Sequence, residues 1–266
     1  MNIMGKVFHA SLWGLRKDKY RYLLENDINT TKWQELEPVA SHFFFVPKDL
    51  DLLKEYERGW SVADIFPVNS TGIKTHRDHF VIDFEEKRLR SRIAEFRDEA
   101  LSDDEVRERF KLRDTRDWKL PEARTKLQER EDWDENFNRC LYRPFDIRPI
   151  YYSGDVIELP RPEVMHHMLQ DNIALIAIRQ VVGPEEYSHF GVTTCVTETR
   201  VFFSNRSAPV ILPLYLYTTP EDTEDFFPAT EEVTREPNLS PDFIAAIGEK
   251  LDLNFVPEGK GDSQST

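Results

Sequence analysis

The sequence predicts an α+β fold, with a mixed and largely antiparallel sheet of short strands and a charged helical insertion. Short apolar runs bounded by Gly, Pro, Asn and Ser recur at residues 172–182, 189–197, 200–205 and 209–217, as is typical of strands. Residues 85–138 are about half charged, with alternating signs and a sparse apolar stripe. That pattern is typical of solvated helices with one narrow buried face.

The first 84 residues predict several small elements. Residues 5–25 indicate a short strand, a turn at Gly14 and a helix from about Arg16. HFFFV at residues 42–46 predicts a compact buried strand, and residues 49–59 have helical spacing with Gly59 as the stop signal. In residues 69–84, NSTG predicts a turn and FVIDF predicts a short apolar strand.

Further along, Ser102 and Glu105 fit a capping box, and Pro121 lies near another helix start. LYRPFDIRPIYY at residues 141–152 carries two prolines, which argue against a regular central strand. A helix is expected at about Pro162, and another over residues 240–251 behind Ser240.

We expect three parts. Residues 1–60 form an N-terminal linker or docking segment, residues 61–217 a core with the insertion at about 85–138, and residues 218–266 an acidic helix and tail. Residues 218–266 hold 12 Asp and Glu against 3 Lys and Arg, so they carry most of the net charge of −14. The remainder is nearly neutral and can present a local basic face to a polyanion.

Composition excludes several classes. With 39% hydrophobic residues the 266-residue chain can fill a core, which argues against wholesale disorder. Two cysteines without CxxC spacing predict reduced thiols rather than a disulfide framework. No apolar run approaches the ~20 residues that span a bilayer. We therefore expect a soluble, cytoplasmic protein without membrane contact.

The stretch NSTGIKTHRDHFVIDF at residues 69–84 concentrates donors and cations between a turn and a strand. A polar loop held by a rigid element is a common way to build a binding site. Residues 141–217 add arginines beside aromatic and turn residues, and a planar guanidinium suits phosphate and guanine. The alternative for each arginine is a carboxylate pair that braces the sheet, available through Asp146, Asp155 and Glu198.

Catalytic patterns are weak. The chain lacks a Walker loop, a GxGxxG after a strand and a GxSxG elbow. The order Asp64, Glu85, Lys87 matches a metal-dependent nuclease, but ExK arises readily by chance in a charge-dense segment. A set of His166, His167, His189 and Cys195 matches no standard zinc spacing. We therefore expect no metal and no cofactor.

A resemblance then narrows the function. GIKTHRDHFVID looks like a segment that follows the catalytic domain in adenine-specific DNA methyltransferases. Together with FHASLWGLRKDKY, DTRDWKL, LYRPFDIRPIYY, the RPEVMHHML helix and LPLYLY, it resembles the C-terminal specificity domain of Type ISP restriction-modification enzymes. The resemblance covers residues 5–255. Methyltransferase and helicase motifs are absent from the sequence. We expect the family's chain to continue past residue 266, so EGKGDSQST departs from the pattern, as in a truncated gene, a split subunit or an excised piece.

The resemblance implies a module that reads duplex DNA beside the methyltransferase and helicase–nuclease parts of the same system, without catalytic activity of its own. The predicted DNA-binding residues are Ser70, Thr71, Lys74, Thr75, His76, Arg77, Arg143, Arg148, Arg179 and Arg206. Position 76 departs from the related segments, which have Gly there and so permit positive φ. Two alternatives remain: a module that docks on a methyltransferase or helicase partner, and a metal-dependent nuclease.

Overall fold

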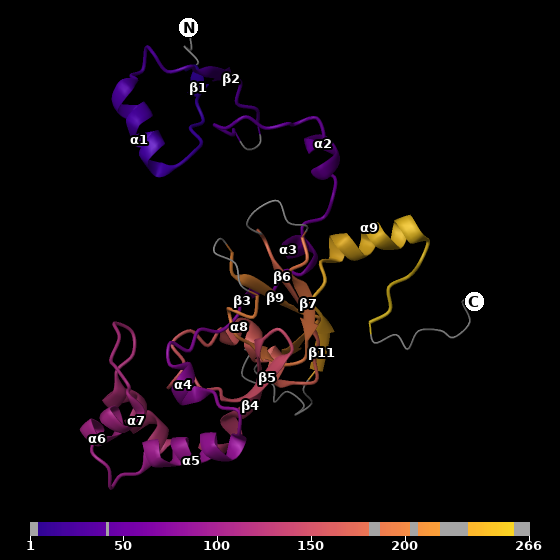
Figure 1. The fold of residues 1–266 in the computed structure, drawn as a ribbon. Helices are drawn as coiled ribbons and strands as arrows, with labels where there is room; N and C mark the ends of the chain where they lie inside the picture. Colours follow the sequence, from indigo (N-terminus) through magenta and orange to yellow (C-terminus); the bar gives the residue numbers. More distant parts are fainter. Residues whose placement is uncertain (1–4, 41–42, 181–186, 203–206, 219–233, 258–266) are drawn as a thin grey trace. The chain divides into compact units, whose positions relative to one another are not determined.

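The structure is a computed structural model that describes residues 5–40, 43–180, 187–202, 207–218 and 234–257. It confirms the predicted α+β class, because helices and mostly antiparallel pairs of short strands alternate along the chain (Figure 1). The chain divides into two compact units, Met1–Trp60 and Ser61–Thr266. In the described residues, no helix is long and apolar enough to cross a membrane.

The first unit consists of the strand pair β1 (Val7–His9) and β2 (Gln34–Leu36) with helices α1 (Arg16–Glu25) and α2 (Leu53–Tyr56). The strand, turn and helix expected over residues 5–25 are present. The strand expected at residues 42–46 is wrong where the structure describes it: residues 43–46 are exposed, and Phe43 has φ +47°. An apolar run becomes a buried strand only where a second layer covers it, and the described residues of this unit bury no side chain.

The second unit contains a four-stranded antiparallel sheet in the order β3-β9-β6-β7. Its strands are β3 (Ser70–Thr71), β9 (Pro209–Pro213), β6 (Ala174–Ile178) and β7 (Phe190–Thr193). Both β3 and β6 pair antiparallel with β9, so they run in the same direction. The segments that leave β3 and β6 therefore emerge at the same end of the sheet.

A three-stranded sheet, in the order β5-β4-β8, lies in the same unit. Strands β4 (Phe137–Arg143) and β5 (Asp146–Tyr151) form a hairpin, and β8 (Val196–Thr197) pairs parallel with β4. The expectation that LYRPFDIRPIYY avoids a central strand is wrong for its first three residues. The prolines do not obstruct β4, because Pro144 lies in the turn and Pro149 on the edge strand.

Residues 85–138 form the predicted helical insertion. Helices α5 (Glu86–Arg97), α6 (Asp103–Phe110) and α7 (Leu120–Glu129) pack together, and the 3₁₀ helix η1 (Trp133–Asn136) leads back to β4 (Figure 1). The capping box is present, because the Ser102 hydroxyl accepts from the Glu105 N–H while the Glu105 carboxylate accepts from the Ser102 N–H. Three stripe residues, Leu89, Ile93 and Phe96, are fully buried.

The strand expected at residues 80–84 is wrong, because Asp78–Val81 is a helical turn, α4. Phe80 is fully buried and its ring lies 5.0 Å from that of Phe96 and 5.6 Å from that of Phe110. The start of the apolar run thus packs on the insertion, and only Ile82 reaches a sheet, through a single antiparallel bridge with Ile150 of β5.

The remaining elements follow the second half of the chain. Helix α8 (Pro162–Met165) begins where predicted, and η2 (His167–Leu169) continues it. The run 209–217 divides between β9 and β10 (Tyr215–Thr218), which pairs with β11 (Thr234–Pro237). The described residues 200–202 of the run 200–205 do not form a strand. The short helix α3 (Val62–Ile65) opens the unit, and α9 (Pro241–Leu251) closes it behind the Ser240 cap.

Candidate nucleic-acid interface

The predicted loop leaves β3 through a close contact between two backbones. A Cβ on Gly72 would lie 2.7 Å from backbone atoms of Thr197, Glu198 and Thr199. The next residue, Ile73, makes two backbone hydrogen bonds across this contact. Its N–H donates to the Thr197 carbonyl (2.9 Å), and its carbonyl accepts from the Thr199 N–H (3.0 Å). Only glycine permits this approach, and it ties the loop to the segment that follows β8.

After this junction, Lys74 pairs with Leu159 through two backbone hydrogen bonds of 3.0 Å, while its side chain is exposed. Thr75 is buried, and its hydroxyl accepts from the Arg77 N–H and donates to Asp78. The second Asp78 oxygen accepts from the Tyr142 hydroxyl at 2.9 Å. Burial raises the pKa of Tyr142, and the bond to Asp78 adds to the shift. These contacts hold the loop in one conformation.

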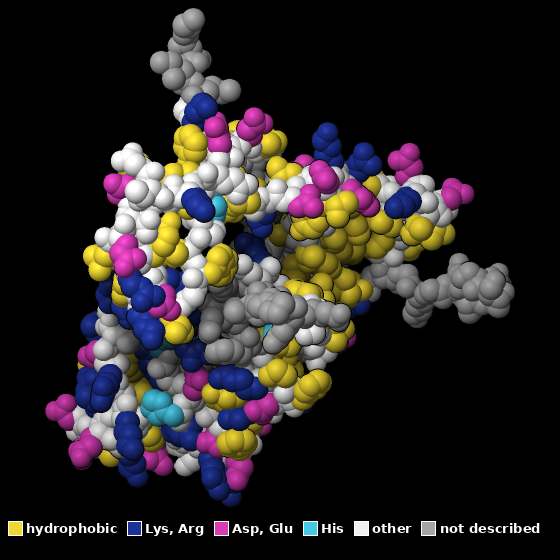
Figure 2. Space-filling model, turned by 45° about the horizontal axis from the view of Figure 1, so that its top comes forward, with side chains coloured by type: hydrophobic (Ala, Val, Ile, Leu, Met, Phe, Trp, Pro, Cys, Tyr) yellow, Lys and Arg dark blue, Asp and Glu magenta, His cyan; other side chains and the backbone are white. Residues whose placement is uncertain are grey.

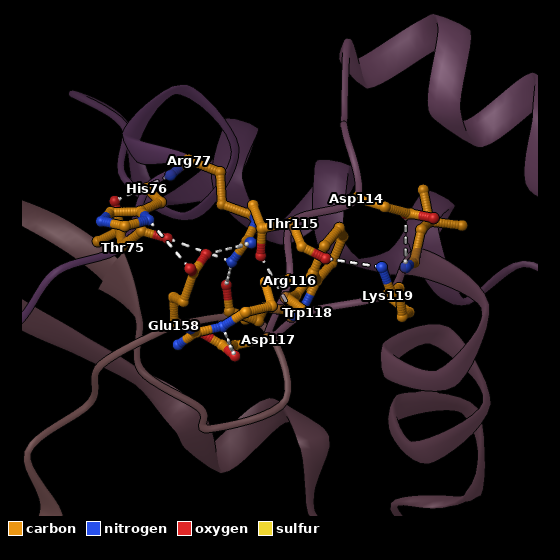
Figure 3. A network of polar contacts seen from close by, with 12 residues as sticks. Thr75, His76, Arg77, Asp114, Thr115, Arg116, Asp117, Trp118, Lys119 and Glu158 are labelled. Atoms are coloured by element: carbon orange, nitrogen blue, oxygen red, sulfur yellow. Dashed lines mark hydrogen bonds and ion pairs between the residues drawn. The ribbon is translucent and has the colours of Figure 1, made fainter.

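The Arg77 side chain lies beside Trp118 and Glu158 (Figure 3). Only 3% of it is exposed. Its guanidinium donates to the carbonyls of Thr75 (3.2 Å) and Val156 (3.0 Å), pairs with the Glu158 carboxylate at 2.9 Å and stacks on Trp118. Burial lowers the pKa of Arg77, against the opposing effect of Glu158. In this conformation Arg77 has no open face for DNA, and its contacts position the loop. Its contact with DNA stays a prediction.

His76 has φ +57°, in the left-handed region. The glycine of the related segments is suited to this conformation, so the histidine keeps the backbone shape and adds a side chain. Its Nδ1 lies 3.1 Å from Glu158, whose other oxygen holds Arg77 (Figure 3). Half of the His76 side chain is exposed. One largely buried carboxylate thus contacts both His76 and Arg77.

A pocket of about 490 Å³ opens beside this loop. Three segments line it, namely the loop itself, the start of DTRDWKL and the segment after β8. The lining residues are Lys74, Thr75, His76, Asp78, Thr115, Glu198, Thr199 and Arg200. Three of the ten predicted residues, Lys74, Thr75 and His76, are therefore brought together here.

DTRDWKL is held by its own contacts. Thr115 and Trp118 exchange hydrogen bonds of 3.0 and 3.2 Å, and the Lys119 ammonium donates to the Thr115 carbonyl at 2.7 Å (Figure 3). The Trp118 indole donates to the Asp155 carbonyl at 2.8 Å. This motif therefore supplies both a wall of the pocket and the ring on which Arg77 stacks.

Arg143 and Arg148 follow the alternative that sequence reasoning left open, in which arginines pair with carboxylates. Arg143 pairs with Glu198 at 2.7 Å, and Arg148 with Asp146 at 2.6 Å. Both guanidinium groups also stack on Tyr142, at 3.8 and 4.4 Å from its ring centre. About a third of the Arg143 side chain and a fifth of the Arg148 side chain remain exposed. Arg143 thus joins β4 to the segment after β8, while the Arg148 pair lies within β5. The DNA contacts of both arginines stay a prediction.

Arg179 directly follows β6 and is exposed, at the same end of the sheet as the exit of β3. One strand, β9, separates β3 from β6, so the two exits are roughly 10 Å apart. Ser70 and Thr71 are half-buried in β3 itself. Arg206 lies outside the described residues.

Arg161 and Arg200 belong to the arginines of residues 141–217 but are not among the ten predicted DNA-binding residues. Among the described residues, neither guanidinium has a carboxylate partner, and Arg200 lines the pocket. Figure 2 shows cationic and acidic side chains interspersed over the visible face. Candidate DNA-contacting cations are therefore recognised by the absence of a carboxylate partner rather than by their place in a dense basic patch.

The described residues add no support for a metal-dependent nuclease or for a zinc site. In the described part of the chain, no group of three or more His, Cys, Asp or Glu side chains could hold a metal ion. Glu85, the N-cap residue of α5, pairs with Arg88 at 3.1 Å. The His167 Nδ1 accepts from the Tyr217 N–H at 3.0 Å, which gives it a structural role.

Comparisons with known proteins agree with the motifs. Residues 64–263 match the family model of the Type ISP C-terminal specificity domain. The chain belongs to this family. The Type ISP match includes the loop of Lys74, the wall of Thr115 and the segment of Arg200. No curated protein sequence matches the chain.

Two solved structures resemble this Type ISP specificity domain in fold. One is a cryo-EM structure of a DrdV–DNA complex (TM-score 0.57, 16% identity), matched over 89% of this chain and 24% of that one. The other is a nuclease-deletion mutant of the Type ISP restriction-modification enzyme LlaGI with a DNA substrate mimic (TM-score 0.52, 18% identity; 88% and 23%). The chain thus spans about a quarter of the length of these proteins.

Proposed function

We propose that this chain is a sequence-specific reader of duplex DNA, without catalytic activity of its own, that works with the methyltransferase and helicase–nuclease parts of a Type ISP system. The family match over residues 64–263 carries the proposal. The similarity in fold to two proteins solved with DNA or a DNA mimic supports it.

The distribution of cations adds support. Lys74, Arg161, Arg179 and Arg200 have no carboxylate partner among the described residues, so their charge is available to phosphates. Such contacts position a protein on duplex DNA, whereas contacts to base edges give specificity. The hydroxyl and carboxylate groups of the pocket beside Lys74 supply the second kind.

Titration of the 266-residue chain with a mixed-sequence duplex at low and at moderate salt tests the proposal. We expect complexes at low salt that weaken steeply as salt rises, because counterions are released from each neutralised phosphate. Absence of binding at low salt would remove DNA reading by this chain and favour protein docking instead.

A second function, docking on the methyltransferase part, is supported by the unit Met1–Trp60. Its described residues bury no side chain, while Trp13, Leu24 and Tyr56 are each more than 80% exposed. Large exposed apolar side chains are typical of interaction surfaces. Co-purification with a Type ISP methyltransferase fragment, compared between the wild-type chain and Trp13→Ala, tests this role. Equal recovery of both would argue against a contact at Trp13.

A further inference from the structure

The pocket beside Lys74 is lined by two carboxylates, which differ in whether an oxygen atom is left without a hydrogen-bond donor. Both oxygens of Asp78 accept from hydroxyl groups, of Thr75 and of Tyr142. The Glu198 contacts, from Arg143 and from the Arg200 N–H, both use Oε2. Among the described residues, Glu198 Oε1 therefore has no partner and remains available as an acceptor.

Thr199 is the second unusual lining residue. It is 6% exposed, and its hydroxyl has no hydrogen-bond partner in the described part of the chain. Nearby threonines are satisfied, because the Thr197 hydroxyl donates to the Cys195 carbonyl at 3.0 Å and the Thr193 hydroxyl to the same carbonyl at 3.3 Å. A buried hydroxyl without a partner is unfavourable for folding, and such groups are concentrated at functional sites.

The charge of the pocket indicates whether a phosphate or a base edge of DNA would occupy it. A phosphate placed deep in the pocket would face the carboxylates of Asp78 and Glu198, which is unfavourable. A base edge with an exocyclic amino group instead donates to a free carboxylate oxygen. Exposed cations among the lining residues, Lys74 and Arg200, suit the phosphates beside such a base.

We propose that this pocket reads the edge of a base that bears an exocyclic amino group, cytosine or adenine. In the major groove Glu198 Oε1 accepts from the amino group, and the Thr199 hydroxyl donates to the adjacent acceptor of the same base pair, which is N7 of adenine or O6 of the guanine paired with cytosine. This assignment rests on the proposed DNA-reading function. The Thr199 hydroxyl is covered in the free chain, so it reaches the base after rotation about χ1 to another staggered conformer. Burial raises the pKa of Glu198, although the hydrogen bond from the Arg200 N–H and the charge of Arg143 act to lower it.

Thr199→Val is the sharpest variant, because it removes a hydroxyl that bonds to nothing described in the free chain and keeps the side-chain shape. Thr197→Val is its matched control, since it removes a satisfied hydroxyl two residues away. Each full-length protein is used to select from a random duplex pool, and thermal unfolding is measured in parallel.

We expect Thr199→Val to unfold at the wild-type temperature or above it. We also expect it to lose discrimination at one base pair by about tenfold, with its affinity for unrelated DNA retained. Thr197→Val should unfold at a lower temperature and select the wild-type sequence. Glu198→Gln, which replaces one carboxylate oxygen by a donor, should shift the preference at the same base pair.

The outcomes are separable. If the wild-type chain selects a sequence and Thr199→Val selects the same one with equal discrimination, the pocket assignment is overturned and the proposed function stands. If the wild-type chain selects no sequence, the proposed function fails for this chain and the assignment fails with it.

Discussion

The guanidinium carbon of Arg77 lies 3.8 Å from the centre of the Trp118 ring, and both side chains are buried. This stack joins two separate motifs, GIKTHRDHFVID and DTRDWKL. Glu158 completes the junction from a third segment, 81 positions from Arg77. The loop that carries Lys74 and His76 is therefore anchored to the protein interior by the buried side chain of Arg77.

Arg77→Ala should lower the free energy of unfolding by about 3 kcal/mol, because it leaves the largely buried Glu158 carboxylate without its guanidinium partner. Urea unfolding followed by tryptophan fluorescence measures the loss. Arg116→Ala is the control, since 91% of that side chain is exposed and its removal should leave the unfolding midpoint unchanged. An Arg77→Ala protein as stable as the wild type would contradict the positioning role.

Gly72→Ala should destabilise the chain by about 1–3 kcal/mol, because the new Cβ meets backbone atoms that cannot move independently. The same measurement on Gly154→Ala provides the comparison, since its nearest neighbour would be the Pro160 Cγ at 3.9 Å. Similar stability of the two variants would show that the contact between the loop and the segment after β8 is loose.

Asp83→Asn should have a pH-dependent effect. Burial alone would raise the pKa of Asp83, but the Glu85 N–H, the Arg92 guanidinium and the Phe84 N–H outweigh it and hold the pKa below 3.8. A carboxyl group whose pKa is lower in the folded chain than in the unfolded chain stabilises the fold at a pH above its unfolded-state pKa. This stabilisation is lost as the pH falls through its folded-state pKa. The variant should therefore be about 1 kcal/mol less stable at neutral pH.

Urea midpoints of the Asp83→Asn and wild-type chains, measured from pH 7 to below pH 3.8, check this expectation. The two curves should converge at the acid end, where Asp83 is protonated in both the folded and the unfolded wild-type chain. A constant difference at every pH would indicate a packing effect rather than an effect of the charge.

Lys74→Ala should weaken binding to all duplex sequences alike and reduce the slope of log K against log salt by about one, as expected for one phosphate contact. Lys126→Ala in α7 is the control, because this exposed lysine belongs to the insertion. An unchanged salt slope for Lys74→Ala, with folding intact, would exclude Lys74 as a phosphate contact.

Features with local causes were predictable from the sequence. The capping box of Ser102 and Glu105 and the helix behind Ser240 depend on residues within one turn. The charged insertion was likewise visible in its apolar stripe, and position 76 was marked by the glycine of the related segments. Its positive φ agrees with that comparison.

Long-range features were not predictable. FVIDF has strand-like composition, but Phe80 is held in a helical turn by Phe96 and Phe110. The prediction of Arg77 as a DNA contact relied on residue type, whereas its burial depends on Trp118 and on the distant Glu158. Arg200 was not selected from the arginines of residues 141–217, because the Arg143–Glu198 pair, which leaves its guanidinium without a carboxylate, forms only in the folded chain.

The hydrogen bonds from Ile73 to Thr197 and from Thr199 to Ile73 join two walls of the pocket through the main chain. The width of the pocket is consequently independent of which side chains line it. Substitutions at exposed positions such as Lys74, His76 and Arg200 can therefore alter the chemistry of the pocket while its main-chain frame stays in place.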